Sequence, residues 1–285
     1  YEITYGDWSS DVCSSDLLIS QDTTFFGMDT WEQRPNPRTP VDSSRGDALT
    51  TLLRELNAIP GDFWVRLLYT HPAHWSDELI KTIAECPKVA RYVDMPLQHA
   101  SDSMLRRMSR RVTRAETEEL LSRLRLRIKG LTLRTTFITG FPGETDDDFA
   151  ELMEFVQKHR FERMGVFTYS FEPDTPAAKL PDHVAADVME QRREQLMQMQ
   201  QAISFEHNDR QIGETIDVIL DQPVEGEKNV WLGRSQADAP DVDGLVFVTG
   251  DKQRLRAGDI VPVEIVATQG YDLVGVAAGK PRARA

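Results

Sequence analysis

One short segment combines two glycines and an acidic residue in a pattern that could bind a ligand. Gly140-Phe141-Pro142-Gly143-Glu144 directly follows a β-patterned stretch and leads into a helical pattern. Glycine lets the backbone approach a ligand closely, and a helix N-terminus offers free N–H groups to a carboxylate or hydroxyl. The alternative is a tight turn between strand and helix that binds nothing. No Gly-Lys-Ser/Thr sequence follows, so the segment is not a P-loop.

A second polar segment follows the apolar stretch that ends at Leu97. If that stretch is a strand, Gln98 and His99 point toward the end of the sheet, and Ser101 follows them. Ligands of parallel α/β proteins bind at the carboxyl ends of the strands. A single histidine is more often structural than catalytic. No Ser or Cys nucleophile is placed nearby, so the sequence does not predict a hydrolase triad.

Polar residues collect after the other apolar stretches as well. His71 and His74 follow one of them and flank Pro72. Two histidines without a carboxylate at ligand spacing do not make a convincing metal site, so no metal ligand is predicted. The remaining polar groups at these positions are 20–23, 70–71 and 170–172.

Two charged clusters lie close to these segments. Arg106, Arg107, Arg110 and Arg111 form a basic cluster in an otherwise acidic chain. They form either a solvent-exposed helix face or a contact for an anionic substrate or cofactor. Asp146-Asp147-Asp148 is interpreted as a solvated first helical turn, which the helix dipole favours.

Strands and helices that alternate along the chain must position these residues. Ser76, Thr113 and Thr145 can each cap a helix, and Thr113 forms a capping box with Glu116. Strict alternation predicts right-handed βαβ units around a parallel sheet. The predicted strands are 17–20, 63–70, 92–97, 131–139 and 164–170, and the predicted helices are 47–58, 76–86, 102–108, 113–129 and 145–159.

The two ends of the chain differ from this region in composition and in sequence pattern. Residues 1–17 show no period and are rich in Ser and Asp, so they are predicted to be non-native or disordered. A long polar helix over 181–208 is expected to cover the last strand and close a domain of residues 18–210. Short β-patterned runs then predict a small OB-like barrel over 211–280, followed by a disordered tail, 281–285.

Composition narrows the class of protein. The chain has 285 residues, 40% hydrophobic and 28% charged, with a net charge of −13. No apolar run approaches the roughly 20 residues of a membrane span, so no membrane association is predicted. An acidic chain disfavours nonspecific binding to nucleic acid and attracts a basic partner. Cys13 and Cys86 are the only cysteines, which fits a reducing cytoplasm and is too few for an iron–sulfur cluster.

Several motifs in order resemble one family. They look like the core of the radical-SAM methylthiotransferases, and the last ~70 residues resemble the TRAM domain of that family. The resemblance implies an α/β fold, a partial (β/α) radical-SAM barrel followed by a small all-β OB-like TRAM barrel. The motifs are LISQDTTFFG (18–27), RLLYTHP (66–72), MPLQHASDSMLRRMSRR (95–111), LRTTFITGFPGETDDDF (133–149) and FTYSFEPDTPAAKL (167–180).

Three stretches resemble one branch of this family in particular. They are SQDTTFFG (20–27), PLQHAS (96–101) and RSQADAPDVDGLVFV (234–248). This branch adds a methylthio group to the β-carbon of an aspartate in small-subunit ribosomal protein S twelve. Residues 211–279 contain 12 Asp or Glu against 5 Lys or Arg, a net charge of −7. A TRAM domain that serves tRNA should be basic, whereas an acidic one suits a basic ribosomal protein.

The resemblance also implies cofactors and roles. The cofactors would be S-adenosyl-L-methionine (SAM) and two 4Fe-4S clusters, whose cysteines would lie upstream of Leu18. The chain is therefore predicted to be an N-terminally truncated fragment that is inactive alone, with its catalytic residues unknown. By resemblance, the SAM pocket is lined by Gln98, His99 and Ser101, its adenine and ribose side is shaped by Gly140, Gly143 and Glu144, and Phe167 and Tyr169 lie at the last strand.

Two other functions stay open at this point. One is a tRNA adenosine methylthiotransferase, which binding of tRNA rather than ribosomal protein would favour. The other is a cluster-free module that docks on the ribosome.

Overall fold

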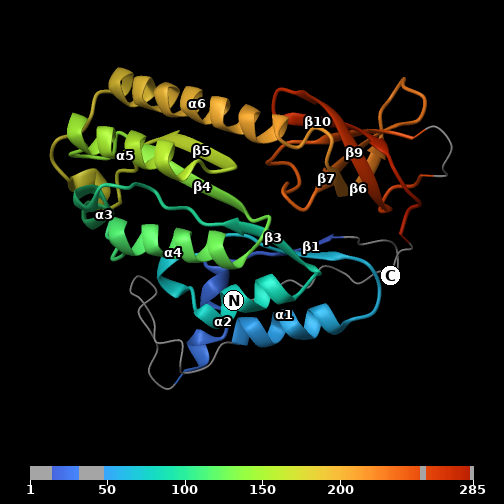
Figure 1. Cartoon of the computed structure of the whole chain (residues 1–285). Coiled ribbons are helices and arrows are strands. Elements are labelled where there is room, and N and C mark those ends of the chain that lie inside the picture. The colour runs from blue at the N-terminus through green and yellow to red at the C-terminus, as the bar shows by residue number, and fades with distance from the viewer. Residues whose placement is uncertain (1–14, 32–47, 251–254, 283–285) are drawn as a thin grey trace.

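A computed structural model describes residues 15–31, 48–250 and 255–282. Five parallel strands form one sheet in the order β1-β2-β3-β4-β5 (Figure 1). The predicted parallel α/β sheet is therefore confirmed. Its strands are β1 (Ser15–Leu18), β2 (Trp64–Leu67), β3 (Val89–Asp94), β4 (Thr132–Thr139) and β5 (Arg163–Thr168).

The helices of this region pack on one face of the sheet. Side chains alternate across a strand, so Val65 and Leu67 of β2 and Leu133 and Phe137 of β4 lie on the same face. All four belong to the main core, together with apolar residues of five helices. The helices are α1 (Ala48–Ala58), α2 (Asp77–Glu85), α3 (Asp102–Arg107), α4 (Arg114–Arg127), α5 (Asp146–His159) and α6 (Ala186–Asp209), with short 3-10 turns η1 (Thr23–Phe25), η2 (Met28–Thr30), η4 (Pro72–His74) and η5 (Ala177–Lys179).

The residues that were predicted to cap helices do so in the structure. Ser76 accepts a hydrogen bond from the backbone N–H of Leu79, and Thr113 forms the predicted capping box with Glu116. Thr145 caps α5 and forms a second capping box. Helix α6 begins at Ala186, later than predicted, and still lies over β5 as expected. No helix of the described residues is both long enough and apolar enough to cross a membrane.

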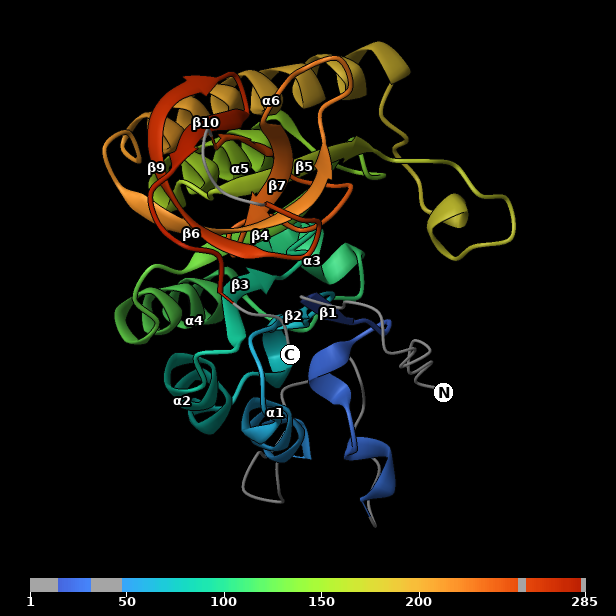
Figure 2. The same cartoon turned by 90° about the vertical axis from the view of Figure 1, so that its right-hand side faces the viewer.

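A closed five-stranded barrel follows α6, which runs from the sheet to the barrel (Figures 1 and 2). The predicted small β-barrel is therefore confirmed. Its neighbours are antiparallel except β10 and β8, which are parallel. The strands are β6 (Thr215–Pro223), β7 (Val230–Ser235), β8 (Val246–Thr249), β9 (Ile260–Gln269) and β10 (Asp272–Ala277).

The barrel contacts the sheet face that carries no helices. Trp64 of β2 packs against Ile219 and Ile260 of the barrel. Tyr92 of β3 packs against Ala239. These contacts involve the first residue of β2 and the middle of β3, and not the carboxyl ends of those two strands.

The described secondary structure extends slightly beyond the predicted domain limits, residues 18 and 280. Strand β1 begins at Ser15, inside the region predicted to be disordered, because Ser15 and Leu17 pair in parallel with β2. Backbone pairing needs no hydrophobic period, which is why the pattern missed it. The tail is ordered as far as Arg282, whose backbone bridges Ile260. Residues 1–14 and 283–285 lie outside the described residues.

Candidate functional site

Large apolar side chains are exposed where the parallel strands end. Ile19 follows β1, Tyr69 follows β2, and Phe167 is the penultimate residue of β5, with exposed fractions of 55%, 46% and 63%. Single exposed apolar residues are ordinary, but several at one edge indicate a binding surface. The carboxyl edge of the sheet is therefore the candidate site, as the sequence predicted.

Gln98 lies at this edge between two strands. Its backbone N–H donates to the carbonyl of Thr136 (2.8 Å), and its carbonyl accepts from the N–H of Ile138 (2.9 Å). Ile138 pairs in register with Phe167. Gln98 is half-buried and has a left-handed backbone (φ 72°). The structure thus places Gln98 and Phe167 on opposite sides of β4, near the carboxyl end of that strand.

His99 and Ser101 lie behind the edge, in the protein interior. Both are 2% exposed. The Nδ1 atom of His99 accepts from the N–H of Ser101 (3.0 Å), which assigns the proton to Nε2. Burial lowers the pKa of His99 to about 4, so the ring is neutral at pH 7. These two residues support the loop, and their direct contact with a ligand stays a prediction.

Glu144 ties the glycine segment to α6. Its side chain is fully buried and accepts from the Gly140 N–H (2.6 Å) and from Arg192 Nη1 (2.8 Å). The nearest atom of His99, Nε2, is 3.8 Å away, too far for a hydrogen bond. Burial raises the pKa of Glu144, although the hydrogen bonds from Gly140 and Arg192 act in the opposite direction. Glu144 therefore fixes the loop that follows β4.

Both glycines of this segment are required by the chain's own packing. Gly140 (φ 74°) and Gly143 (φ 85°) have left-handed backbones that favour glycine. A Cβ at Gly140 would overlap Met189, and one at Gly143 would overlap the guanidinium of Arg107. The sequence attributed these glycines to a closely approaching ligand, whereas the described structure fills both spaces with protein side chains.

The interpretation of the triple aspartate was wrong for Asp148. Asp148 is 8% exposed and completes the capping box with Thr145, so it is not a solvated residue. It also accepts from the hydroxyls of Ser101 (2.5 Å) and Ser103. Burial raises its pKa, but these hydrogen bonds outweigh burial and hold the pKa of Asp148 below its ordinary value. Asp146 is exposed and pairs with Arg192.

The loops after β1 and β2 bring together Asp22, His71 and His74. One ligand-type atom from each lies within 4.8 Å of the other two, so the carboxylate that sequence spacing lacked comes from another loop. His74 Nδ1 and Asp22 Oδ2 are 2.5 Å apart, and Thr23 N–H donates to the Tyr69 carbonyl. Such a set can bind a transition metal. Here its hydrogen bonds join the two loops, and burial lowers the pKa of His71 to about 4.

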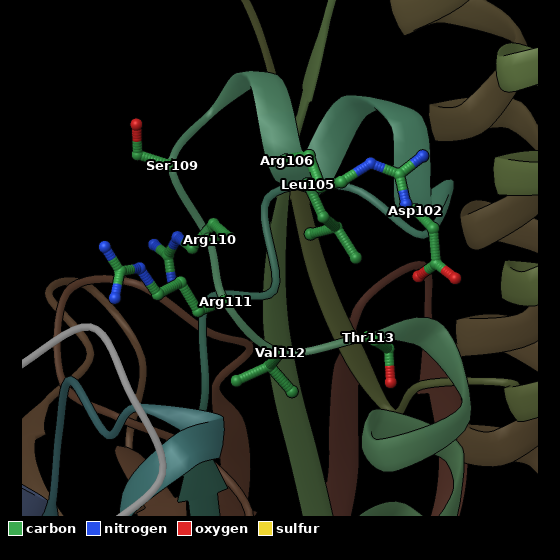
Figure 3. A pocket seen from close by; sticks show the side chains of 8 residues that line it. All are labelled: Asp102, Leu105, Arg106, Ser109, Arg110, Arg111, Val112 and Thr113. Atoms are coloured by element: carbon green, nitrogen blue, oxygen red, sulfur yellow. The ribbon is translucent and has the colours of Figure 1, made fainter.

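A cavity of about 470 Å³ opens beside this edge, between α3 and α4 (Figure 3). Three of the four clustered arginines line it, and two of these three, Arg106 and Arg111, are exposed. The fourth, Arg107, donates to the carbonyl of Pro142 (3.0 Å). The lining residues are Asp102, Leu105, Arg106, Ser109, Arg110, Arg111, Val112 and Thr113.

Tyr169 lies one residue beyond β5. Its backbone N–H donates to the carbonyl of Thr139, and its ring contacts Phe141 with centroids 5.3 Å apart. Its hydroxyl is buried and has no hydrogen-bond partner among the described residues. A buried hydroxyl rarely stays unpaired, so this atom is a candidate ligand contact.

The cysteines do not form a cluster site in the described part of the chain. Cys86 is 7% exposed within the helical core, and burial raises the pKa of its thiol. One thiol cannot supply the three or four thiolates that hold a four-iron cluster. Cys13 lies outside the described residues. The donor set of the described ranges therefore does not fit an iron–sulfur cluster.

Comparisons with known proteins agree with the fold. Residues 39–156 match the Radical SAM superfamily, and residues 212–277 match the TRAM domain. A relative from Opitutus terrae, "Ribosomal protein uS12 methylthiotransferase RimO", is 54% identical over 94% of this chain and 55% of its own length. A protein of the same name from Akkermansia muciniphila is 49% identical over 90% of this chain and 55% of its own length. The chain thus spans about half the length of these curated relatives.

Among solved structures, the radical SAM enzyme coproporphyrinogen III oxidase (HemN) from Escherichia coli is similar, with a TM-score of 0.44 and 19% identity. That similarity covers 60% of this chain and 39% of HemN. The match to the Radical SAM superfamily implies SAM and 4Fe-4S clusters as cofactors. Strands β2, β3 and β4 lie within the Radical SAM match and the closed barrel lies within the TRAM match, so the chain carries a radical SAM segment followed by a TRAM domain.

Proposed function

We propose that this chain is the radical SAM and TRAM part of a cytoplasmic methylthiotransferase that modifies an aspartate of ribosomal protein S twelve. The observation that carries this proposal is the 54% identity with a RimO-named relative along 94% of the chain. The proposed domains are 18–210 and 211–280.

The carboxyl edge of the sheet fits a nucleotide sulfonium such as SAM. Phe167 offers an exposed ring for stacking, and Gln98 and the unpaired Tyr169 hydroxyl offer polar contacts. When bound to a reduced iron–sulfur cluster, SAM supplies a carbon radical that can remove hydrogen from an unactivated carbon. The segment of Gly140, Gly143 and Glu144 is held rigid by α6 and would form one wall.

We also propose that this chain alone does not catalyse the reaction. Its whole sequence has two cysteines, whereas a four-iron cluster needs three or four thiolates. What this chain's own residues supply is a rigid edge that binds and orients the reactants.

The test uses a protein that joins this chain to the remaining part of the RimO-named relative from Opitutus terrae, of whose length this chain matches 55%. It is loaded anaerobically with iron and sulfide and incubated with SAM, a reductant and purified S twelve. Mass spectrometry should find one methylthio group on an aspartate, and none on S twelve in which that aspartate is asparagine. Modification of tRNA but not of S twelve would contradict the proposal.

A further inference from the structure

The cavity between α3 and α4 concentrates positive charge in an acidic protein. Arg106, Arg110 and Arg111 all line it (Figure 3), although the whole chain carries a net charge of −13. Arg106 and Arg111 are exposed, and Arg110 is half-buried.

Arg106 and Arg111 differ from most arginines in the part of the chain that the structure describes. Most arginines in the described ranges pair with a carboxylate, as Arg114 does with Glu118. Within those ranges neither Arg106 nor Arg111 has an ion pair. Asp102 is the one acidic lining residue, and its Oδ1 accepts from the backbone N–H of Arg114 (2.7 Å).

The walls of the cavity combine these charges with apolar surface. Leu105 and Val112 are buried side chains that line it. A phosphate backbone prefers an extended, exposed basic strip. A bounded recess that combines guanidinium groups with an apolar wall can admit a protein side chain that ends in a carboxylate. The observations therefore favour a polypeptide over a nucleic acid.

We propose that this cavity binds the side-chain carboxylate of the aspartate that is to be modified. The inference rests on the proposed function and names the residues that would select its substrate. Guanidinium groups bind carboxylates through paired, directional hydrogen bonds. The carbon to be modified is bonded directly to that carboxylate, so holding the carboxylate fixes the position of the carbon.

A hydrogen bond also links helix α3, which lines the cavity, to the loop of the candidate site. Arg107, in the same helix as Arg106, donates to the carbonyl of Pro142 in the loop after β4. Helix α3 itself begins at Asp102, four residues after Gln98. A carboxylate held by Arg106 and Arg111 would therefore lie beside the edge proposed for SAM.

Binding of purified S twelve to this chain tests the proposal. The variant Arg106→Gln/Arg111→Gln should bind S twelve about tenfold more weakly, as expected for losing a charge-assisted contact. The matched control Arg91→Gln removes an exposed arginine that bonds the Lys129 carbonyl, and it should leave affinity unchanged. Melting curves of each variant check folding.

The second arm uses S twelve with asparagine in place of the target aspartate. The double variant should bind this protein as well as the unchanged chain does, because the carboxylate is absent. Equal weakening toward both forms of S twelve, no weakening at all, or weakening only toward an RNA oligonucleotide would each overturn the inference while leaving the proposed function intact. Failure of the unchanged chain to bind S twelve would contradict the proposed function, and the inference with it.

Discussion

Gly140 and Gly130 share a left-handed backbone but have different surroundings. Gly130 (φ 71°) follows the end of α4, and no atom lies within 4 Å of the position that a Cβ would take there. The same position at Gly140 overlaps the first side-chain atoms of Met189 on α6. At Gly143 the overlapping group is the end of a flexible arginine, which can move aside at lower cost. We therefore expect the cost of adding a Cβ to rise from Gly130 to Gly143 to Gly140.

The first prediction compares Gly140→Ala with Gly130→Ala. Gly130→Ala should lower the free energy of unfolding by about 1 kcal/mol, the cost of a left-handed alanine. Gly140→Ala should lower it by a further ~1–3 kcal/mol, because the added Cβ overlaps the first side-chain atoms of Met189 and that side chain must shift. Urea unfolding of both variants measures the difference. Equal losses would show that Met189 rearranges freely.

The second prediction concerns the neutral, buried imidazole of His99. Its pKa is lowered to about 4 in the folded protein, so the unfolded chain binds a proton more readily below pH 6.5. Stability should therefore fall as pH drops from 6.5 toward 4. His99→Asn keeps an acceptor for the Ser101 N–H and removes the titration. Between pH 7 and pH 5 this variant should lose about 1–2 kcal/mol less than the unchanged chain. Identical losses in urea unfolding would contradict a neutral His99.

At the scale of elements, the segment 235–243 joins the barrel to the sheet. Arg163 of β5 pairs with Asp238 (2.6 Å), and the Tyr92 hydroxyl of β3 donates to Asp243 (2.6 Å). Arg66 of β2 donates to the carbonyl of Gln236 (2.8 Å). The stretch that resembled the ribosomal branch therefore includes residues whose role in the structure is to hold the two domains together.

The third prediction tests this interface with Asp238→Asn. Asp238 and Arg163 are almost fully buried, and removing one partner of a buried pair costs about 3–5 kcal/mol. Asp221→Asn is the control, because its pair with Arg234 is partly exposed and should be worth about 0–1 kcal/mol. Thermal unfolding followed by calorimetry should show a large loss only for Asp238→Asn. Similar losses would mean that apolar contacts of Trp64 carry the interface.

The sequence predicted these elements well where the information is local. Capping residues such as Thr113 and Thr145, and the apolar face of each strand, act within a few residues of the chain, so pattern alone identifies them. Asp148 was misjudged because its partners Ser101 and Ser103 are distant in sequence. Asp22 was not linked to His74 for the same reason, since only strand order places their loops side by side.

At the scale of the whole molecule, the negative charge of the barrel is partly internal. Residues 211–279 have a net charge of −7, but Asp238 is buried against Arg163 and Asp243 lies near Arg134 of the sheet. These two carboxylates add little to the field outside. The acidic surface that a basic partner would meet comes from exposed residues such as Glu225 and Glu227.

The fourth prediction tests whether the position of acidic residues on the barrel, or only the net charge of the chain, attracts a basic partner. Glu225→Gln/Glu227→Gln removes two exposed charges from the barrel, and Glu55→Gln/Asp62→Asn removes two exposed charges near the end of α1. Both variants change the net charge equally. If the barrel steers a basic ribosomal protein, the first variant should slow association with S twelve several-fold at low salt, and the second should slow it less. Raising the ionic strength should erase the difference, because screening shortens the range of the field to about 8 Å at 0.15 M. Stopped-flow association rates measure this, and equal slowing by both variants would show that net charge alone, and not the barrel, attracts the partner.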